Sequence, residues 1–234
     1  MIKSIIEFLK HRRIYSSSSS YINYLRDNHI KIGEDCLFRN PKSTIIDITR
    51  PSLVEIGNGV HFCDWFTLLT HDFTSNVFLN LYGEFIPSSG KVVIGNNVYF
   101  NQRCTVLKNV TIGDNCIFGY GSTIMKDIPA NSVAVGTPAK VISTVEEYYK
   151  KRCEKSIEEA LAYARSIKER FGRMPKPEDF HDDFPLFVNG NEMDKYPTID
   201  FKKTLVGDNL MNWEKNHQAV FKNFDDFIEH AFAE

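Results

Sequence analysis

Bulky apolar residues recur at every sixth position through the middle of the chain. Starting at residue 94, the step of six gives Ile94, Phe100, Val106, Ile112, Phe118 and Ile124. Small or β-branched residues follow four positions after the first five of these, namely Val98, Cys104, Val110, Cys116 and Ser122. Neither the 3.6-residue period of a helix nor the two-residue period of a strand produces this pattern. The repeat therefore predicts a solenoid in which each unit is one short strand and a turn.

The same six-residue step continues upstream, where two of seven positions are not bulky apolar residues. The positions are Ile32, Phe38, Thr44, Arg50, Ile56, Phe62 and Leu68. Thr44 and Arg50 are the exceptions, and they lie beside Pro41 and Pro51, where we expect irregular coils. The upstream and downstream blocks are out of phase, which predicts a loop that leaves the repeat at residues 72–90.

On either side of the repeat, apolar residues recur with the spacing of a helix. Near the start, apolar residues at positions 2, 5, 6 and 9 predict a short amphipathic helix, which is too short and too charged to be a signal peptide or a membrane span. Weak contact of this helix with a membrane surface is left open. The serines at positions 16–20 are expected to be a linker.

Beyond Ile142 the sequence predicts a helix over residues 145–171, with acidic residues early, basic residues late and Gly172 at its end. A final helix is expected around residues 221–232. We thus expect an N-terminal helix and linker (1–30), a solenoid domain (31–142) and a mainly helical extension (143–234), whose role the sequence leaves open.

The charge and the cysteine content of the chain limit which partners and metals are expected. The formal net charge is −2 and no dense Lys/Arg cluster occurs, so nucleic acid is not an expected partner. The five cysteines are odd in number and lack paired spacings, which argues against a disulfide framework and a zinc site. Free thiols are typical of a reducing compartment, and we expect a cytoplasmic protein.

Residues 94–142 carry a family resemblance; they read IGNNVYFNQRCTVLKNVTIGDNCIFGYGSTIMKDIPANSVAVGTPAKVI. This stretch closely resembles the hexapeptide-repeat acyltransferases, in the branch of galactoside, maltose and polysaccharide O-acetyltransferases. The resemblance implies an all-β solenoid core, specifically a left-handed parallel β-helix. It also implies a homotrimer with active sites between subunits and acetyl-CoA as cosubstrate, with no metal.

The resemblance also implies catalytic residues. His71 lies where the repeat breaks, and the family's general base is a histidine at this junction; a neutral imidazole can take the proton of a sugar hydroxyl as the oxygen attacks a thioester. The backbone amide of Gln102 is the expected oxyanion donor. Glu84, on the returning part of the loop, is our candidate for orienting His71.

The remaining candidates bind the two substrates. By resemblance, the cofactor-binding set is Gly119, Tyr120, Ser122, Gly136, Thr137 and Lys140, with Lys140 facing a CoA phosphate. The acceptor-binding set is Trp65, Asp72, Tyr99 and Asn101. Tyr99 and Asn101 replace the Trp and Gly that the galactoside branch usually carries, so the acceptor pocket is expected to differ. Trp65, Phe66 and Phe73 flank His71 in the sequence; such aromatics either stack on a sugar ring or pack in the core or a trimer interface, and we favour packing.

The acceptor is expected to be a sugar or a nucleotide- or lipid-linked saccharide, in surface polysaccharide synthesis. Three alternatives stay open at this point. The first is an N-acyltransferase that acts on an amino sugar or another small amine, and the second is a non-catalytic solenoid that only binds. The third is a metal enzyme like the γ-class carbonic anhydrases, which need three histidines around zinc, whereas only His61 and His71 lie in the repeat.

Overall fold

The computed structural model describes residues 12–201 and 208–233. The chain divides into two compact units, Met1–Tyr148 and Tyr149–Glu234. Most of the predicted N-terminal helix, residues 1–11, lies outside the described residues. The serine run that we expected to be a linker instead begins helix α2 (Ser18–Asp27), because the hydroxyl of Ser17 caps it by accepting a hydrogen bond from Ser20 N at 3.1 Å.

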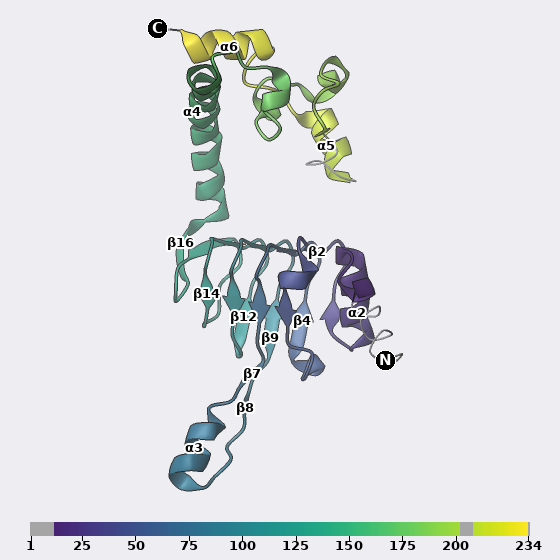
Figure 1. Cartoon of the computed structure of the whole chain (residues 1–234), viewed down its shortest axis with the longest axis vertical. Helices are drawn as coiled ribbons and strands as arrows, with labels where there is room; N and C mark the ends of the chain where they lie inside the picture. Colours follow the sequence, from purple (N-terminus) through teal and green to yellow (C-terminus); the bar gives the residue numbers. More distant parts are fainter. Residues whose placement is uncertain (1–11, 202–207, 234) are drawn as a thin grey trace. The chain divides into compact units, whose positions relative to one another are not determined.

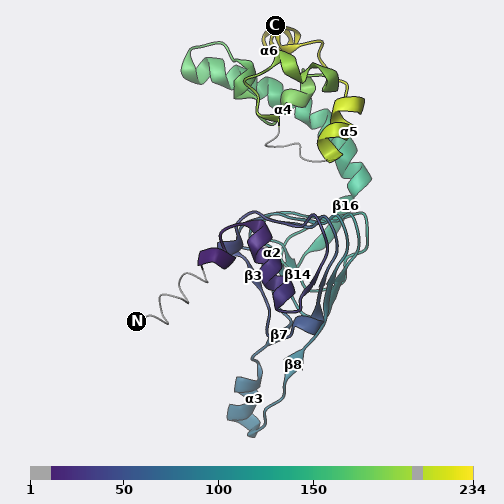
Figure 2. The same ribbon diagram turned by 90° about the vertical axis from the view of Figure 1, so that its right-hand side faces the viewer.

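The first unit is a coil of short strands that visit three parallel sheets in turn (Figures 1 and 2). Sheet 1 contains β1 (Lys31–Ile32), β4 (Val54–Ile56), β9 (Val92–Ile94) and β12 (Val110–Ile112). Sheet 2 contains β2 (Leu37–Phe38), β5 (His61–Phe62), β10 (Tyr99–Phe100), β13 (Ile117–Phe118) and β15 (Ser132–Val135), with β16 (Lys140–Thr144) antiparallel at its end. Sheet 3 contains β3 (Ile45–Ile46), β6 (Thr67–Leu68), β11 (Thr105–Val106) and β14 (Thr123–Ile124). We call the turns from sheet 1 to 2, from 2 to 3 and from 3 to 1 the first, second and third edges of the coil.

The repeated apolar residues fill the interior, as predicted. Four phenylalanines of sheet 2 lie in register and stack face to face: Phe38, Phe62, Phe100 and Phe118. Their ring centroids are 4.5, 5.4 and 4.9 Å apart in succession, and each pair of planes is tilted by 7°. Every one of these rings is buried. Because each ring is covered by the rings of the neighbouring coils, the large apolar residue at this position of every coil is a packing requirement.

The two failures of the repeat mark extra residues in the turns. Short 3₁₀ helices η1 (Pro41–Ser43) and η2 (Pro51–Leu53) begin at the two prolines and lengthen the connections. The interior position of β3 is therefore Ile46, two positions beyond Thr44, and it pairs with Leu68 of β6.

The predicted loop leaves the coil at the third edge. It begins with β7 (His71–Asp72), which pairs antiparallel with β8 (Ser88–Ser89), and it carries helix α3 (Ser75–Tyr82) at its far end (Figure 1). Helix α3 ends at Gly83, whose φ of 70° is a left-handed conformation that glycine adopts without a steric penalty. We call residues 72–90 the excursion.

The second unit has its own apolar core. Helix α4 (Val145–Phe171) has the predicted bounds, and it places Ala160, Ala164 and Ile167 in this core. The other elements of the unit are η3 (Pro177–Asp179), η4 (Phe184–Leu186), η5 (Gly190–Lys195), α5 (Asp208–Asn216) and α6 (Phe224–Phe232). The final helix thus begins three residues later than predicted, where Asn223 caps it. Across the described ranges, no helix is long and apolar enough to cross a membrane.

Candidate active site

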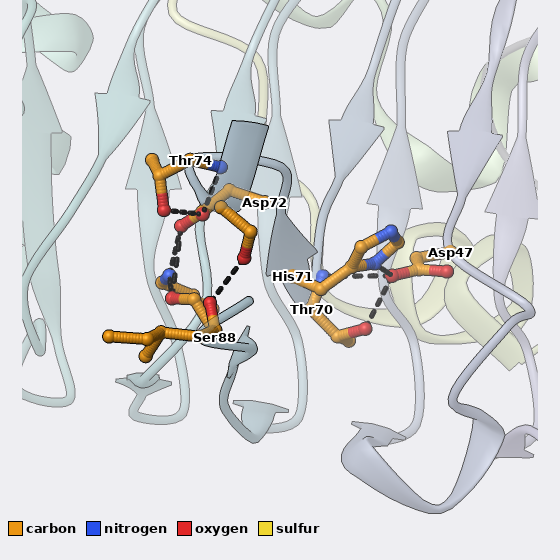
Figure 3. Close-up of polar contacts among 9 residues, drawn as sticks. Asp47, Thr70, His71, Asp72, Thr74 and Ser88 are labelled. Carbon is orange, nitrogen blue, oxygen red and sulfur yellow. Dashed lines mark hydrogen bonds and ion pairs between the residues drawn. The ribbon is translucent and has the colours of Figure 1, made fainter. Parts of the chain in front are cut away.

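His71 is held at the third edge by an aspartate from the neighbouring coil. His71 Nδ1 lies 2.6 Å from Asp47 Oδ2, and the two side chains point toward each other (Figure 3). Asp47 follows β3, whereas His71 follows β6, and the pairing of these strands brings the two residues together. The Asp47 side chain is 3% exposed and that of His71 is 16% exposed.

Asp47 is a carboxylate with a full set of donors. Oδ1 accepts hydrogen bonds from the Thr49 hydroxyl at 2.6 Å and from Thr49 N at 3.0 Å. Oδ2 accepts from Thr70 N at 3.1 Å and from the Thr70 hydroxyl, in addition to His71. Burial alone raises the pKa of Asp47, but the hydrogen bonds from Thr49, Thr70 and His71 outweigh it and hold this pKa well below its ordinary value.

This arrangement selects one tautomer of His71. An ionised carboxylate only accepts hydrogen bonds, so Nδ1 of a neutral His71 must carry the hydrogen. Nε2 then has a free lone pair that can accept a proton. An imidazole that becomes charged at Nε2 is stabilised by the carboxylate behind it. The pair therefore has the geometry of a general base with its orienting acid.

The residues predicted around His71 are only partly found there. The orienting partner is Asp47 rather than Glu84, which is exposed in the excursion beyond α3. The ring of Phe73 meets the imidazole edge-on, with centroids 5.3 Å apart. Trp65 lies instead at the second edge, and Phe66 is buried between Phe62 and Phe100.

Gln102 also lies at the second edge, in the turn between β10 and β11. Its backbone N–H donates to Oδ1 of Asn101 at 2.7 Å. Within one chain, the second edge is separated from the third by the width of sheet 3. The structure therefore does not bring Gln102 and His71 together in a single copy.

Most of the predicted CoA-binding residues gather along this second edge. The turn that contains Gly119 and Tyr120 lies one coil beyond Gln102, and Gly121 N donates to Gln102 O at 2.9 Å. The hydroxyl of Thr137 donates to Gly121 O at 3.1 Å, so the segment with Gly136 continues the same edge. Tyr120 is 60% exposed.

Lys140 and Ser122 differ in their access to this surface. Lys140 is exposed and begins β16, opposite Val135. Ser122 is fully buried, and its hydroxyl donates to Gly119 O at 2.7 Å. This removes the Ser122 side chain from the candidate CoA surface. A Cβ on Gly119 would lie 2.7 Å from the Val135 side chain, so this glycine has a packing role in any case.

The predicted acceptor residues do not form one cluster in a single copy. Tyr99 faces outward from sheet 2, and its hydroxyl accepts a hydrogen bond from Cys63 Sγ at 3.4 Å. The neighbouring Cys63 side chain and burial raise the pKa of Tyr99 to about 12. Asp72, in contrast, is bound at the start of the excursion by Thr74, Ser88 and Lys108.

Sequence reasoning missed Asp47, Thr49 and Thr70. An acidic residue between Ile46 and Ile48 was a usable signal, because a carboxylate inside an apolar strand needs donors around it. In the parts of the chain that the structure describes, no group of three or more His, Cys, Asp or Glu side chains is placed to hold a metal ion.

Known proteins place this architecture in one family. A family model described as bacterial transferase hexapeptide (six repeats) matches residues 91–126. Protein CapG of Staphylococcus aureus is 39% identical over 130 residues, which cover 56% of this chain and 74% of CapG. A coil of six-residue units with this degree of likeness defines the class: the chain belongs to the hexapeptide-repeat acyltransferases.

Two further proteins show shorter or weaker likeness. The 2,3,4,5-tetrahydropyridine-2,6-dicarboxylate N-acetyltransferase of Halalkalibacterium halodurans is 46% identical over 68 residues, which cover 29% of this chain and 28% of that protein. A maltose O-acetyltransferase structure from Clostridium difficile 630 has 31% identity and a TM-score of 0.39, covering 50% of this chain and 59% of that one. The chain thus spans less than two thirds of these two proteins.

Proposed function

We propose that the chain is an acetyl-CoA-dependent O-acetyltransferase that modifies a hydroxyl of a saccharide, with His71 as general base. The observation that carries this proposal is the His71–Asp47 pair, in which Nδ1 lies 2.6 Å from a buried carboxylate and Nε2 is left to accept a proton. Membership of the hexapeptide-repeat acyltransferases supports the acetyl donor. The same membership supports a left-handed sense for the coil.

The chemistry transfers one acetyl group and one proton. Nε2 takes the proton of the acceptor hydroxyl while its oxygen attacks the thioester carbonyl, giving a tetrahedral intermediate. Collapse of the intermediate breaks the carbon–sulfur bond, and the proton on Nε2 passes to the leaving sulfur. The products are the acetyl ester and free CoA, and Asp47 stabilises the imidazolium between the two steps.

The oxyanion requires a donor from outside the His71 edge. The Gln102 N–H is engaged by the side chain of Asn101, not by the backbone of the coil, so in our proposal the oxyanion takes the place of Asn101 Oδ1. Because Gln102 and His71 lie on different edges of one coil, the two groups meet when the second edge of one copy faces the third edge of another. Such a contact joins different surfaces and can close into a ring, and the family resemblance gives that ring three copies, so we propose a homotrimer with the site between copies.

A hydroxyl acceptor depends on the base more strongly than an amine acceptor does. A hydroxyl must lose its proton during attack, and the His71–Asp47 pair supplies a base supported by a buried charge. The N-acyltransferase alternative keeps the same base, so the acceptor must be decided by assay. We therefore propose a screen of acetyl transfer from acetyl-CoA across sugars, nucleotide-linked sugars and amino sugars.

The screen is run beside His71→Ala, with His181→Ala as the control because His181 is exposed in the second unit. We expect His71→Ala to lower kcat by about 10²–10⁴-fold with little change in folding, and His181→Ala to match the wild type. Equal activity of His71→Ala and the wild type would remove His71 from the mechanism. Transfer to amino sugars alone would replace the O-acetyltransferase with the alternative.

A mixing experiment tests the shared site. Arg103 has a φ of 62°, which places Gln102 at the preceding turn position, where proline is favoured. Gln102→Pro therefore removes the amide hydrogen without removing a backbone hydrogen bond of the coil. If the site lies between copies of a trimer, co-refolded His71→Ala and Gln102→Pro chains should recover about a quarter of the wild-type sites. No recovery from a mixed trimer would show that each site belongs to one copy.

A further inference from the structure

One lysine of the coil binds both legs of the excursion. Lys108 Nζ donates hydrogen bonds to Asp72 Oδ2 and to Ser88 Oγ. Asp72 lies on the outgoing strand β7 and Ser88 on the returning strand β8. We call Asp72, Thr74, Ser88 and Lys108 the root cluster of the excursion; Figure 3 shows its Asp72, Thr74 and Ser88 beside the His71–Asp47 pair.

Lys108 reaches the excursion from another coil. Lys108 follows β11, and β11 pairs with β6, the strand after which the excursion begins. Lys108 therefore lies one coil beyond the start of the excursion. The two legs themselves share only a short ladder, His71 with Ser89 and Asp72 with Ser88. Most of the large apolar side chains of α3 are exposed, namely Val77, Leu79, Leu81 and Tyr82, and Phe78 is half-buried. The attachment of the excursion to the coil therefore depends strongly on its root.

The root cluster contains an ion pair between Lys108 and Asp72. The hydrogen bond from Lys108 is the largest influence on the pKa of Asp72, followed by those from Thr74, and together they hold this pKa well below its ordinary value. Lys108 and Asp72 are 25% and 37% exposed, so solvent partly screens their attraction. Ser88 donates to the same carboxylate at 3.1 Å, which joins the three side chains in one network.

We propose that Lys108 is a positioning residue for acetyl transfer, because its ammonium fixes the excursion against the edge that carries the general base. His71 is the residue directly before Asp72 and belongs to the same two-residue strand. Movement of the root therefore shifts the excursion relative to the imidazole. The effect falls on the acceptor, because residues 72–90 contain none of the predicted CoA-binding residues. This inference rests on the proposed function for its kinetic consequence but not for its structural one.

The test compares Lys108→Met, which keeps the stem and removes the charge, with Lys108→Arg. Lys91→Met is the matched control, because Lys91 directly follows the excursion but pairs with Glu55 at 2.7 Å on the coil. We expect Lys108→Met to increase amide hydrogen exchange in residues 71–90 roughly five- to tenfold. The KM for the acceptor should rise by a similar factor while the KM for acetyl-CoA changes by less than about twofold. Lys108→Arg should recover most of both effects.

A second variant guards against a folding defect. Asp72→Asn removes the charge from the other side of the pair, and we expect the same increase in exchange and the same selective rise in KM. Unchanged exchange in either variant, or an equal rise of both KM values, would overturn the inference. The exchange measurement tests the root cluster independently of the proposed function. If His71→Ala were active, the general base would be refuted, but the effect of Lys108 on exchange in residues 71–90 could still be measured.

Discussion

Replacing Asp47 by Asn tests the charge behind His71 with almost no change of shape. Oδ2 of Asp47 receives the His71 and Thr70 donors, and Oδ1 receives those of Thr49. An amide NH₂ group directed at His71 donates to Nδ1, which moves the ring hydrogen to Nε2 and removes the base. The imidazolium also loses its countercharge: two unit charges about 4 Å apart attract by about 4 kcal/mol at an effective dielectric constant near 20.

These effects predict a fall in kcat of about 10²–10⁴-fold for Asp47→Asn, since each 1.4 kcal/mol is about a tenfold change in rate. The assay is steady-state acetyl transfer at neutral pH, followed by release of free CoA. The free energy of unfolding should fall by about 1–3 kcal/mol, because at least one buried donor loses its acceptor. Urea unfolding therefore accompanies the kinetics, so that activity is compared only under conditions where both proteins are folded.

Asp114→Asn provides the control for this experiment. Asp114 Oδ1 accepts a hydrogen bond from Asn96 N at 2.6 Å at the first edge, so the variant also changes a carboxylate that binds coil backbone. We expect it to alter stability without changing kcat. A folded Asp47→Asn protein with kcat within about threefold of the wild type would show that neither the tautomer of His71 nor its countercharge matters for the reaction.

Three further predictions address the core, acid stability and the cosubstrate. Phe100→Ala, in the middle of the stacked rings, should lower the free energy of unfolding by about 3–5 kcal/mol in urea titrations; a loss below about 1 kcal/mol would contradict close packing. The pKa of Asp47 in the folded state lies below its ordinary value. The ionised Asp47 therefore stabilises the folded state above about pH 4, and this stabilisation is lost as the pH falls further. Melting temperatures should therefore decline less steeply below pH 5 for Asp47→Asn than for the wild type, and parallel curves would count against this. Lys140→Gln should raise the KM for acetyl-CoA about five- to tenfold with kcat little changed, as a lost phosphate contact requires; an unchanged KM would remove Lys140 from the CoA site.

The excursion shows how far sequence pattern carries a structural prediction. The change of phase between the two repeat blocks located it at residues 72–90, and His71 at its start marked the candidate base. Its helix and its root cluster were not predicted, because a pairing such as Lys108 with Asp72 joins residues from different coils. The repeat predicts that coils stack, but it does not give the register across an interruption.

Local spacing along the chain is sufficient to define the repeating unit. A ring or branched side chain at every sixth position has to face a narrow interior, and so the strands, their inward residues and the long helix α4 followed from local spacing. The acid that supports His71 could be identified only from the way the coils stack. The prolines at positions 41 and 51 lengthen the turns on either side of β3, so counting by six does not place Asp47 beside His71. The pairing of Ile46 with Leu68 places Asp47 beside His71, although the two residues are 24 positions apart in the sequence. Backbone hydrogen bonds between coils, and not sequence spacing, set this register.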